Sequence, residues 1–252
     1  MAVAATPERS TIPAVNTFGF RANLKAVLFW ISLGAAAGGL GGVLIGGVGG
    51  RLAMFALRLT SHDSVRGVES DDGFIIGRFG VFDTAQLLLT TAVMGCLVGL
   101  IVVAGRPFFP KRGMPLAWAM AGAITGGAIL ITKDGVDFTL LGPKSFAVAL
   151  FIAIPALGAG LIAWLTEVFP RFWWQSRRLT AVAAPAAVPA VIFLPLAVIA
   201  LLVGVCWALA MCSHTMRAFP GWMPARVAAI VVFTAIVVLG LFDLTSDVSA
   251  IL

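Results

Sequence analysis

The stretch that decides the fold is AVLFWISLGAAAGGLGGVLIGGVGG, residues 26–50, in which 25 consecutive residues carry no charge. A helix needs about 20 mostly apolar residues to cross a bilayer. Backbone polar groups in lipid must find their partners within the protein, so such a run predicts a membrane-spanning helix. Glycine recurs at every fourth position of its second half, at Gly34, Gly38, Gly42, Gly46 and Gly50.

Residues four apart lie on one side of a helix, so these glycines form a smooth helix-packing face. Such a face lets two helix backbones approach closely, and close packing is what holds helices together in lipid. We expect the partner to lie within the chain, because Gly95 with Gly99, and Gly122 with Gly126, repeat the spacing in later apolar segments. The alternatives are a homo-oligomer joined through this face, in the manner of a glycine zipper, and a pore lined by it.

The rest of the chain has the same apolar character. Of its 252 residues, 60% are hydrophobic and 11% are charged, whereas soluble domains contain about 25% charged residues. Further apolar runs fall at 84–105, 115–132, 146–166, 190–211 and 226–243. The sequence therefore predicts an all-α polytopic membrane helix bundle of about six transmembrane helices. Residues 1–22 are expected to be a cytoplasmic N-terminal tail, and 23–252 a single transmembrane domain.

The distribution of Lys and Arg predicts the orientation of the chain, because cytoplasmic loops carry the excess of these residues. Segments on the N-terminal side are the shorter and denser in basic residues, above all GRPFFPKRG at 105–113. We expect the chain to be a multi-pass protein of the bacterial plasma membrane, with both termini in the cytoplasm. The net charge of +6 comes from residues between apolar spans, which indicates the lipid bilayer as partner and no nucleic acid.

An acidic segment follows the first span. Five of the chain's eleven Asp and Glu residues fall within 61–83, at Asp63, Glu69, Asp71, Asp72 and Asp83. One hypothesis is a solvated loop in which Arg66 and Arg78 balance the acids. A second is a divalent-cation site formed by the first four of these acids, because Ca²⁺ and Mg²⁺ prefer carboxylate oxygens. A third is a catalytic or substrate-binding site, in which paired carboxylates act with His62.

A second polar loop, residues 132–145, is expected on the same side of the membrane. It contributes Lys133, Asp134 and Asp137, together with Lys144. If the two loops meet, they form one polar cap over the bundle. Apart from a cation in that cap, we expect no cofactor and no metal site, since the three cysteines, Cys96, Cys206 and Cys212, form no CxxC pair.

Two quoted segments carry a resemblance. GVESDDGFIIGRFG at 67–80 and DGVDFTLLGPKSFAVALFIAIPALGAGLIAWL at 134–165 resemble a group of uncharacterised multi-pass integral membrane proteins of actinobacteria. The likeness covers roughly the first four predicted spans. It implies a helical membrane protein of bacterial origin and implies no activity for any residue.

The predicted span interiors hold almost no ionisable side chains, and Arg51 is the marginal exception. Transporters usually place such groups inside their spans, so the pattern argues against a proton-coupled transporter. The sequence favours a non-enzymatic membrane scaffold or accessory subunit, working with a membrane-protein partner. The first alternative is a small permease or channel component. The second is an enzyme at the extracytoplasmic face that uses the acidic loop 61–83.

Overall fold

The computed structural model describes residues 20–62, 67, 80–109, 113–133, 135, 142–173 and 223–252. Within these residues every regular element is a helix, which agrees with the predicted all-α class. The predicted span 190–211 and most of the predicted N-terminal tail lie outside the described residues.

The first predicted span is part of one long rod. It consists of α1 (Phe20–Gly41), the π-helical segment η1 (Gly42–Gly49) and α2 (Gly50–Thr60). At 1.5 Å per residue the rod is about 60 Å long, so it exceeds the thickness of a bilayer. The rod ends at Ser61, whose backbone is extended.

Four further rods complete the described structure. They are α3 (Val81–Gly105); α4 (Met114–Ala121) with η3 (Gly122–Gly126) and α5 (Gly127–Leu130); α7 (Lys144–Trp173); and α11 (Met223–Ile251). Four described helices are long and apolar enough to cross a membrane, at Phe29–Thr60, Val81–Gly105, Lys144–Pro170 and Arg226–Ile251. The rod Met114–Leu130 is apolar but shorter. The structure therefore supports a membrane helix bundle, and the predicted count of six spans is not confirmed.

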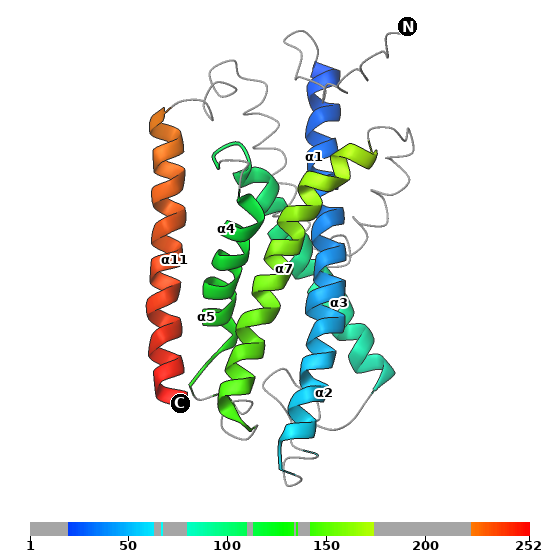
Figure 1. The fold of residues 1–252 in the computed structure, drawn as a ribbon. Helices are drawn as coiled ribbons and strands as arrows, with labels where there is room; N and C mark the ends of the chain where they lie inside the picture. The colour runs from blue at the N-terminus through cyan, green and yellow to red at the C-terminus, as the bar shows by residue number, and fades with distance from the viewer. Residues whose placement is uncertain are drawn as a thin grey trace, which may run out of the picture.

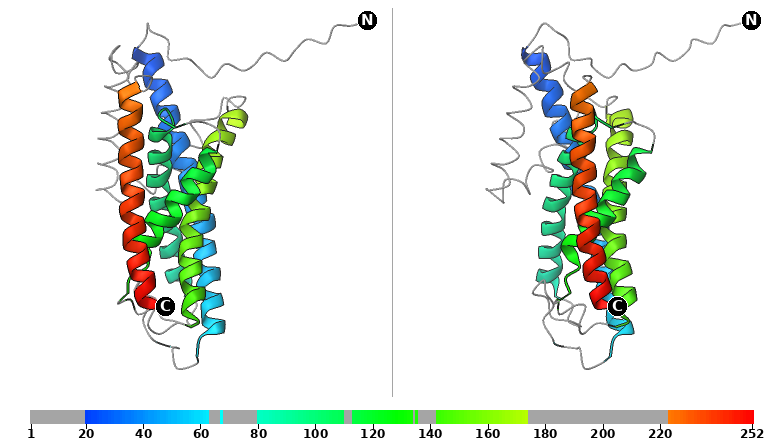
Figure 2. Two further views of the ribbon diagram at one scale, coloured as in Figure 1. Left: turned by 60° about the vertical axis from the view of Figure 1, so that its left-hand side comes forward. Right: turned by 90° about the vertical axis from the view of Figure 1, so that its left-hand side faces the viewer.

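The rods stand side by side and alternate in direction up to α7 (Figures 1 and 2). We call the end where α1 begins the α1 end, and the end where α2 stops the His62 end. Helix α11 begins at the α1 end and finishes at the His62 end, as α1 and α2 do (Figure 1). The start of α1 and the end of α11 therefore lie at opposite ends of the described bundle, and the side of the membrane on which each terminus lies stays a prediction.

Two hydrophobic clusters fix the direction of α11. At the His62 end, Leu244 and Ile251 of α11 are buried with Leu57, Ile131 and Ala147. Towards the α1 end, Phe233 of α11 lies 4.9 Å from the ring of Phe109 and 5.3 Å from that of Trp118, between ring centroids. Because Phe233 lies in the first half of α11 and Ile251 at its end, these contacts with different ends of the bundle give the helix the direction seen in Figure 1.

The glycine face of the first rod lies against α3. A Cβ added at Gly34 would stand 2.9 Å from the carbonyl oxygen of Gly99. Added at Gly38 or Gly42, it would collide with the carbonyl oxygen of Gly95 or of Thr91. The two backbones therefore touch without intervening side chains, and these positions have no room for a second copy of the chain or for a pore. Gly50 has no such neighbour within 4 Å.

The glycines of the third predicted span have a different partner from the one we expected. A Cβ at Gly122 would meet the backbone of Pro155 at 2.6 Å, and one at Gly126 would meet the Pro155 ring. This span therefore packs against α7, rather than supplying a complementary face to the first rod. Helix α7 thus packs against η3 through Pro155 and also approaches the first rod, where Gly158 lies near Ile45 of η1.

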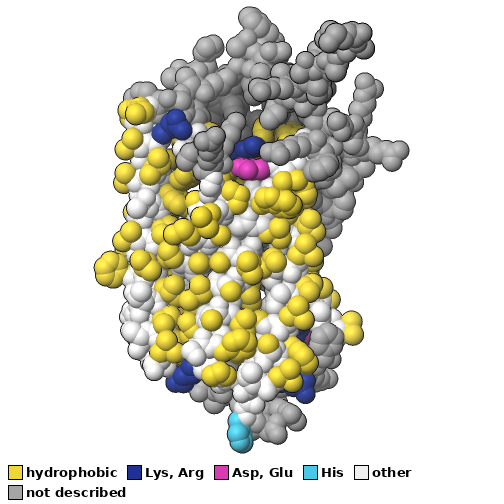
Figure 3. Space-filling model, in the orientation of Figure 1, with side chains coloured by type: hydrophobic (Ala, Val, Ile, Leu, Met, Phe, Trp, Pro, Cys, Tyr) yellow, Lys and Arg dark blue, Asp and Glu magenta, His cyan; other side chains and the backbone are white. Residues whose placement is uncertain are grey.

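The outer surface of the bundle is apolar along its middle. Figure 3 shows hydrophobic side chains over the central part of one face, with Lys, Arg, Asp, Glu and His side chains towards the two ends. Large exposed side chains include Leu52, Met94, Ile129, Leu157 and Val231. A band of this kind matches the lipid-facing surface of a membrane protein.

The direction of α11 yields a topology prediction. In a background where the native cysteines are replaced by alanine, thiols introduced at His62 and at Leu252 should react with an impermeant maleimide from the same side of sealed vesicles. A thiol introduced at Gly113 should react from the other side, because α4 begins at the α1 end. If Leu252 and Gly113 were labelled from the same side, the direction of α11 would be wrong.

The contact between α1 and α3 yields a stability prediction. Gly38→Ala places a methyl group against the Gly95 carbonyl and should lower the free energy of unfolding by about 1–3 kcal/mol, the usual cost of overpacking. Gly50→Ala is the matched control, because it adds the same methyl group where nothing lies within 4 Å. It should be neutral or stabilise by up to about 1 kcal/mol. The test is to compare the thermal unfolding midpoints of the two variants in detergent. Equal midpoints would refute the close contact between α1 and α3.

Candidate functional site

The two predicted polar loops begin at the same end of the bundle. Loop 61–83 starts where α2 ends, and loop 132–145 lies between α5 and α7. Figure 1 shows α2, α5 and the start of α7 at this His62 end. The buried cluster of Leu57, Ile131 and Ala147 packs directly beneath it. The fold therefore brings together the boundaries of the two predicted loops.

A direct contact joins the loops. The Gly142 N–H donates to Ser61 Oγ at 3.1 Å, while the Ser61 hydroxyl donates to the Leu57 carbonyl at 2.7 Å. Ser61 thus connects the end of α2 to the residue two positions before α7. Nearby, Lys144 Nζ donates to the Ile251 carbonyl at 3.3 Å, which attaches the end of α11 to the same place.

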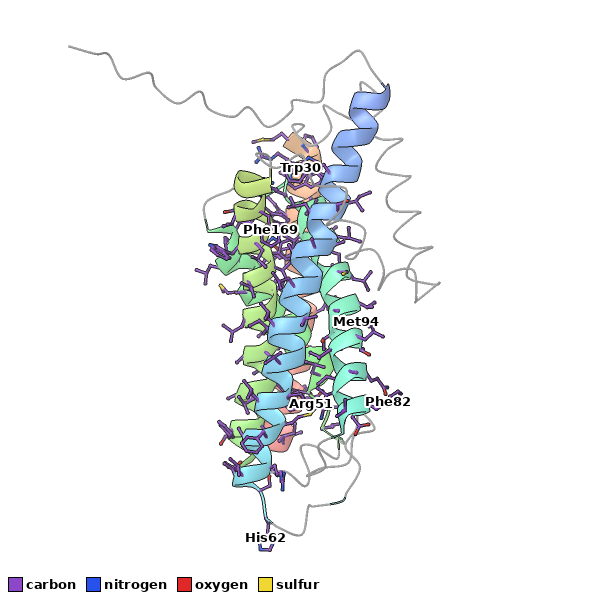
Figure 4. All side chains as sticks on the ribbon, turned by 90° about the vertical axis from the view of Figure 1, so that its right-hand side faces the viewer. Trp30, Arg51, His62, Phe82, Met94 and Phe169 are labelled. Carbon is purple, nitrogen blue, oxygen red and sulfur yellow. The ribbon has the colours of Figure 1, made fainter. Side chains whose placement is uncertain are left out.

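Most of the candidate site residues lie outside the described part of the chain. These are Asp63, Glu69, Asp71 and Asp72 of the first loop, and Asp134 and Asp137 of the second. His62 is described and lies exposed at the tip of the bundle (Figure 4). Lys133 is also exposed, directly beyond α5. Within the described residues no group of three or more His, Cys, Asp or Glu side chains could hold a metal ion, so the cation hypothesis stays a prediction.

Asp83 is the acid of the first loop that the structure places. It lies in the first turn of α3, where the positive end of the helix dipole favours a carboxylate. Its carboxylate folds back over Gly80, into the space that a side chain at Gly80 would need. The Thr84 hydroxyl donates to the Gly80 carbonyl at 2.8 Å and completes this turn. Asp83 is therefore used locally to begin a helix.

Arg51 lies deeper than the other charged residues of this end. It precedes the end of α2 by nine residues, or about 13 Å along the helix axis. Its Nε and Nη2 atoms are buried, and Figure 4 shows the residue inward of His62, towards α3. An ionisable group at membrane depth normally faces the protein interior, where other groups compensate its charge. The sequence singled out Arg51 as the marginal ionisable residue within a predicted span, and the structure buries these two atoms of its guanidinium.

A second charged group lies at the α1 end. The Arg106 guanidinium stands over the Trp30 ring, 4.8 Å from its centroid. Burial lowers the pKa of Arg106, and the nearby carboxylate of Glu167 acts in the opposite direction. One side chain therefore links α1, the end of α3 and α7. The sequence indicated only that Arg106 belongs to a basic segment, because contacts between helices depend on how each helix is rotated about its axis.

Comparison with protein-family models, with curated proteins and with solved structures finds no match to this chain. The resemblance to actinobacterial membrane proteins therefore stays a prediction. Within the described residues, the His62 end has joined loop boundaries, basic side chains that include Lys133 and Lys144, and the internal Arg51. These features define no reaction, and the polar cap that the two loops would form stays a prediction.

The connection between the loops yields a prediction. Ser61→Ala removes the acceptor of the Gly142 N–H and should cost about 1 kcal/mol of stability. Amide exchange at Gly142 should become faster, because that hydrogen bond protects it. Ser249→Ala is the control, since its hydroxyl bonds only to the Ser246 carbonyl of its own helix. Unchanged exchange at Gly142 in the Ser61 variant would show that the loops are not joined there.

Proposed function

We propose that this chain acts in the bacterial plasma membrane as a non-enzymatic scaffold or accessory subunit of a membrane complex. The observation that carries the proposal is the close-packed centre of the described bundle. The first rod touches α3 backbone to backbone, and η1 and η3 both pack against α7. A centre filled in this way supports a rigid helical platform better than a path for cargo.

The polar content of this centre supports the same proposal. Among the described residues, Thr166 is the one fully buried polar side chain, and its hydroxyl donates to the Ala163 carbonyl at 2.8 Å. Its single O–H donor is therefore used within its own helix. Binding of an ion or a polar solute at membrane depth requires groups that exchange partners with the cargo. Among the described residues Arg51, whose Nε and Nη2 atoms are buried, is the exception, so the permease alternative has less support than the scaffold.

The surface of α11 supports binding to a partner. The face turned away from α5 carries Val227, Val231 and Val238, all exposed. These positions are four and seven residues apart, so they form one apolar stripe along the helix. Small β-branched side chains of this kind lose little rotamer freedom when another helix packs against them. We propose this stripe as the surface through which the subunit meets its partner.

The proposal predicts a defined complex. The tagged protein, extracted gently from its own membrane, should carry a different membrane protein at fixed stoichiometry in native mass spectrometry. The double substitution Val231→Trp with Val238→Trp keeps the helix apolar but changes its shape, and should abolish the complex at an unchanged thermal midpoint. Met94→Trp is the control, because Met94 is exposed on α3 and should leave the complex intact.

Other outcomes point to the alternatives. A bare protein that passes solute in liposomes would replace the scaffold proposal with the permease. A complex that survives the α11 double substitution would place the partner surface elsewhere. Loss of function in Asp71→Asn with Asp72→Asn, at unchanged stability and with the complex intact, would favour an enzyme that uses loop 61–83.

A further inference from the structure

A groove of about 650 Å³ lies on the outside of the bundle, between η3 and α5 on one side and α11 on the other. Its apolar wall is formed by Ile129, Ile236 and Leu239. At 77% exposure, Ile129 shows that the groove opens sideways, towards the space that lipid occupies. Its volume falls within the range of small-ligand sites, about 300–1,000 Å³.

One part of the groove is polar. Asp243, Ser246 and Thr125 all line it, and Asp243 is exposed. No hydrogen bond or ion pair links the Asp243 carboxylate to the described part of the chain. The Thr125 hydroxyl donates to the Ala121 carbonyl at 2.8 Å, which leaves the lone pairs of its oxygen as acceptors.

The depth of Asp243 makes its exposure costly. It follows Arg226 by 17 residues, or about 25 Å along the helix axis. The hydrocarbon layer is about 30 Å thick, so the carboxylate lies near the edge of that layer on the side of the His62 end. A carboxylate at that depth is stable only if a positive group or water compensates its charge. An occupant that combines a cation with an apolar body would compensate this carboxylate and also cover the apolar wall of the groove.

The chemistry of the polar part selects the kind of cation. A carboxylate and two hydroxyl oxygens together present several acceptors, and a primary ammonium presents three donors. A quaternary ammonium has the same charge but no N–H group to donate. A phosphate alone would be repelled by the carboxylate. The favoured occupant is therefore an amphiphile that carries –NH₃⁺.

We propose that this groove binds a membrane lipid whose headgroup ends in a primary ammonium. The ammonium bonds to Asp243 and the neighbouring hydroxyls, and an acyl chain lies along the apolar wall. The groove and the partner stripe use different residues of α11, since Val227, Val231 and Val238 do not line the groove, although Phe242, one turn beyond Val238, does.

The probe is phosphatidylethanolamine, compared with phosphatidylcholine of the same acyl chains. The two differ in the N–H donors of the headgroup. Full-length protein is reconstituted in equal mixtures of the two lipids, extracted, and examined by native mass spectrometry. The wild-type protein should retain one phosphatidylethanolamine in preference to phosphatidylcholine. Asp243→Asn should weaken that retention by about tenfold, as expected for loss of a charge-assisted hydrogen bond.

Two further variants separate binding from folding. Asp247→Asn removes a carboxylate one turn further along α11, outside the groove, and should leave retention unchanged. Leu239→Trp fills the apolar wall and should abolish retention at an unchanged thermal midpoint. Equal retention of the two lipids by the wild-type protein overturns the proposal. So does an Asp243→Asn variant that still selects phosphatidylethanolamine, or a groove occupied by a second copy of the chain, seen as a dimer that Leu239→Trp dissociates.

Discussion

The contact between the backbones of α1 and α3 is the constraint on which the rest of the structure depends. At Gly34, Gly38 and Gly42 a single added Cβ atom would collide with the backbone of α3. Dispersion forces fall off steeply with distance, so contacts of this kind stabilise a bundle only when the two surfaces match closely. Because the first rod is held against α3, its other side is free to receive α7. Helix α7 in turn positions η3 through Pro155.

Charge and aromatic side chains act at the two ends rather than in the middle. Arg106 lies over Trp30 at one end, and Lys144 reaches the Ile251 carbonyl at the other. Each contact joins elements that are far apart in the sequence. In the apolar middle of the described structure close packing dominates, and the Cys96 thiol of α3 adds one hydrogen bond between rods by donating to the Ala35 carbonyl of α1 at 3.2 Å. The bundle therefore combines a tightly fitted centre with polar attachments at the ends, where water and headgroups are available.

The pattern of apolar runs predicted the helical class, because hydropathy over about 20 residues is a local property of the chain. The spacing of Gly34, Gly38 and Gly42 indicated a face that needs a close neighbour. It could not indicate which helix that neighbour would be: Gly95 and Gly99 lie opposite this face, whereas Gly122 and Gly126 lie against Pro155. The sequence did not indicate the direction of α11 either, because the distribution of basic residues says nothing about contacts such as that of Phe233 with Phe109. Of the predicted site, the structure describes His62 and Lys133, and Asp243 was passed over because it stood at the end of an apolar run.

The attachment of α11 has a consequence for how the molecule comes apart. This helix meets the rest of the described structure at η3, α5 and the two end clusters, and most of its apolar residues remain exposed. Regions with few buried contacts open at a lower free energy than the global unfolding of a protein. Separation of α11 should therefore precede disruption of the unit formed by α1, α3 and α7. We therefore expect two cooperative units of unequal stability, and the less stable unit, α11, carries the exposed apolar side chains described above.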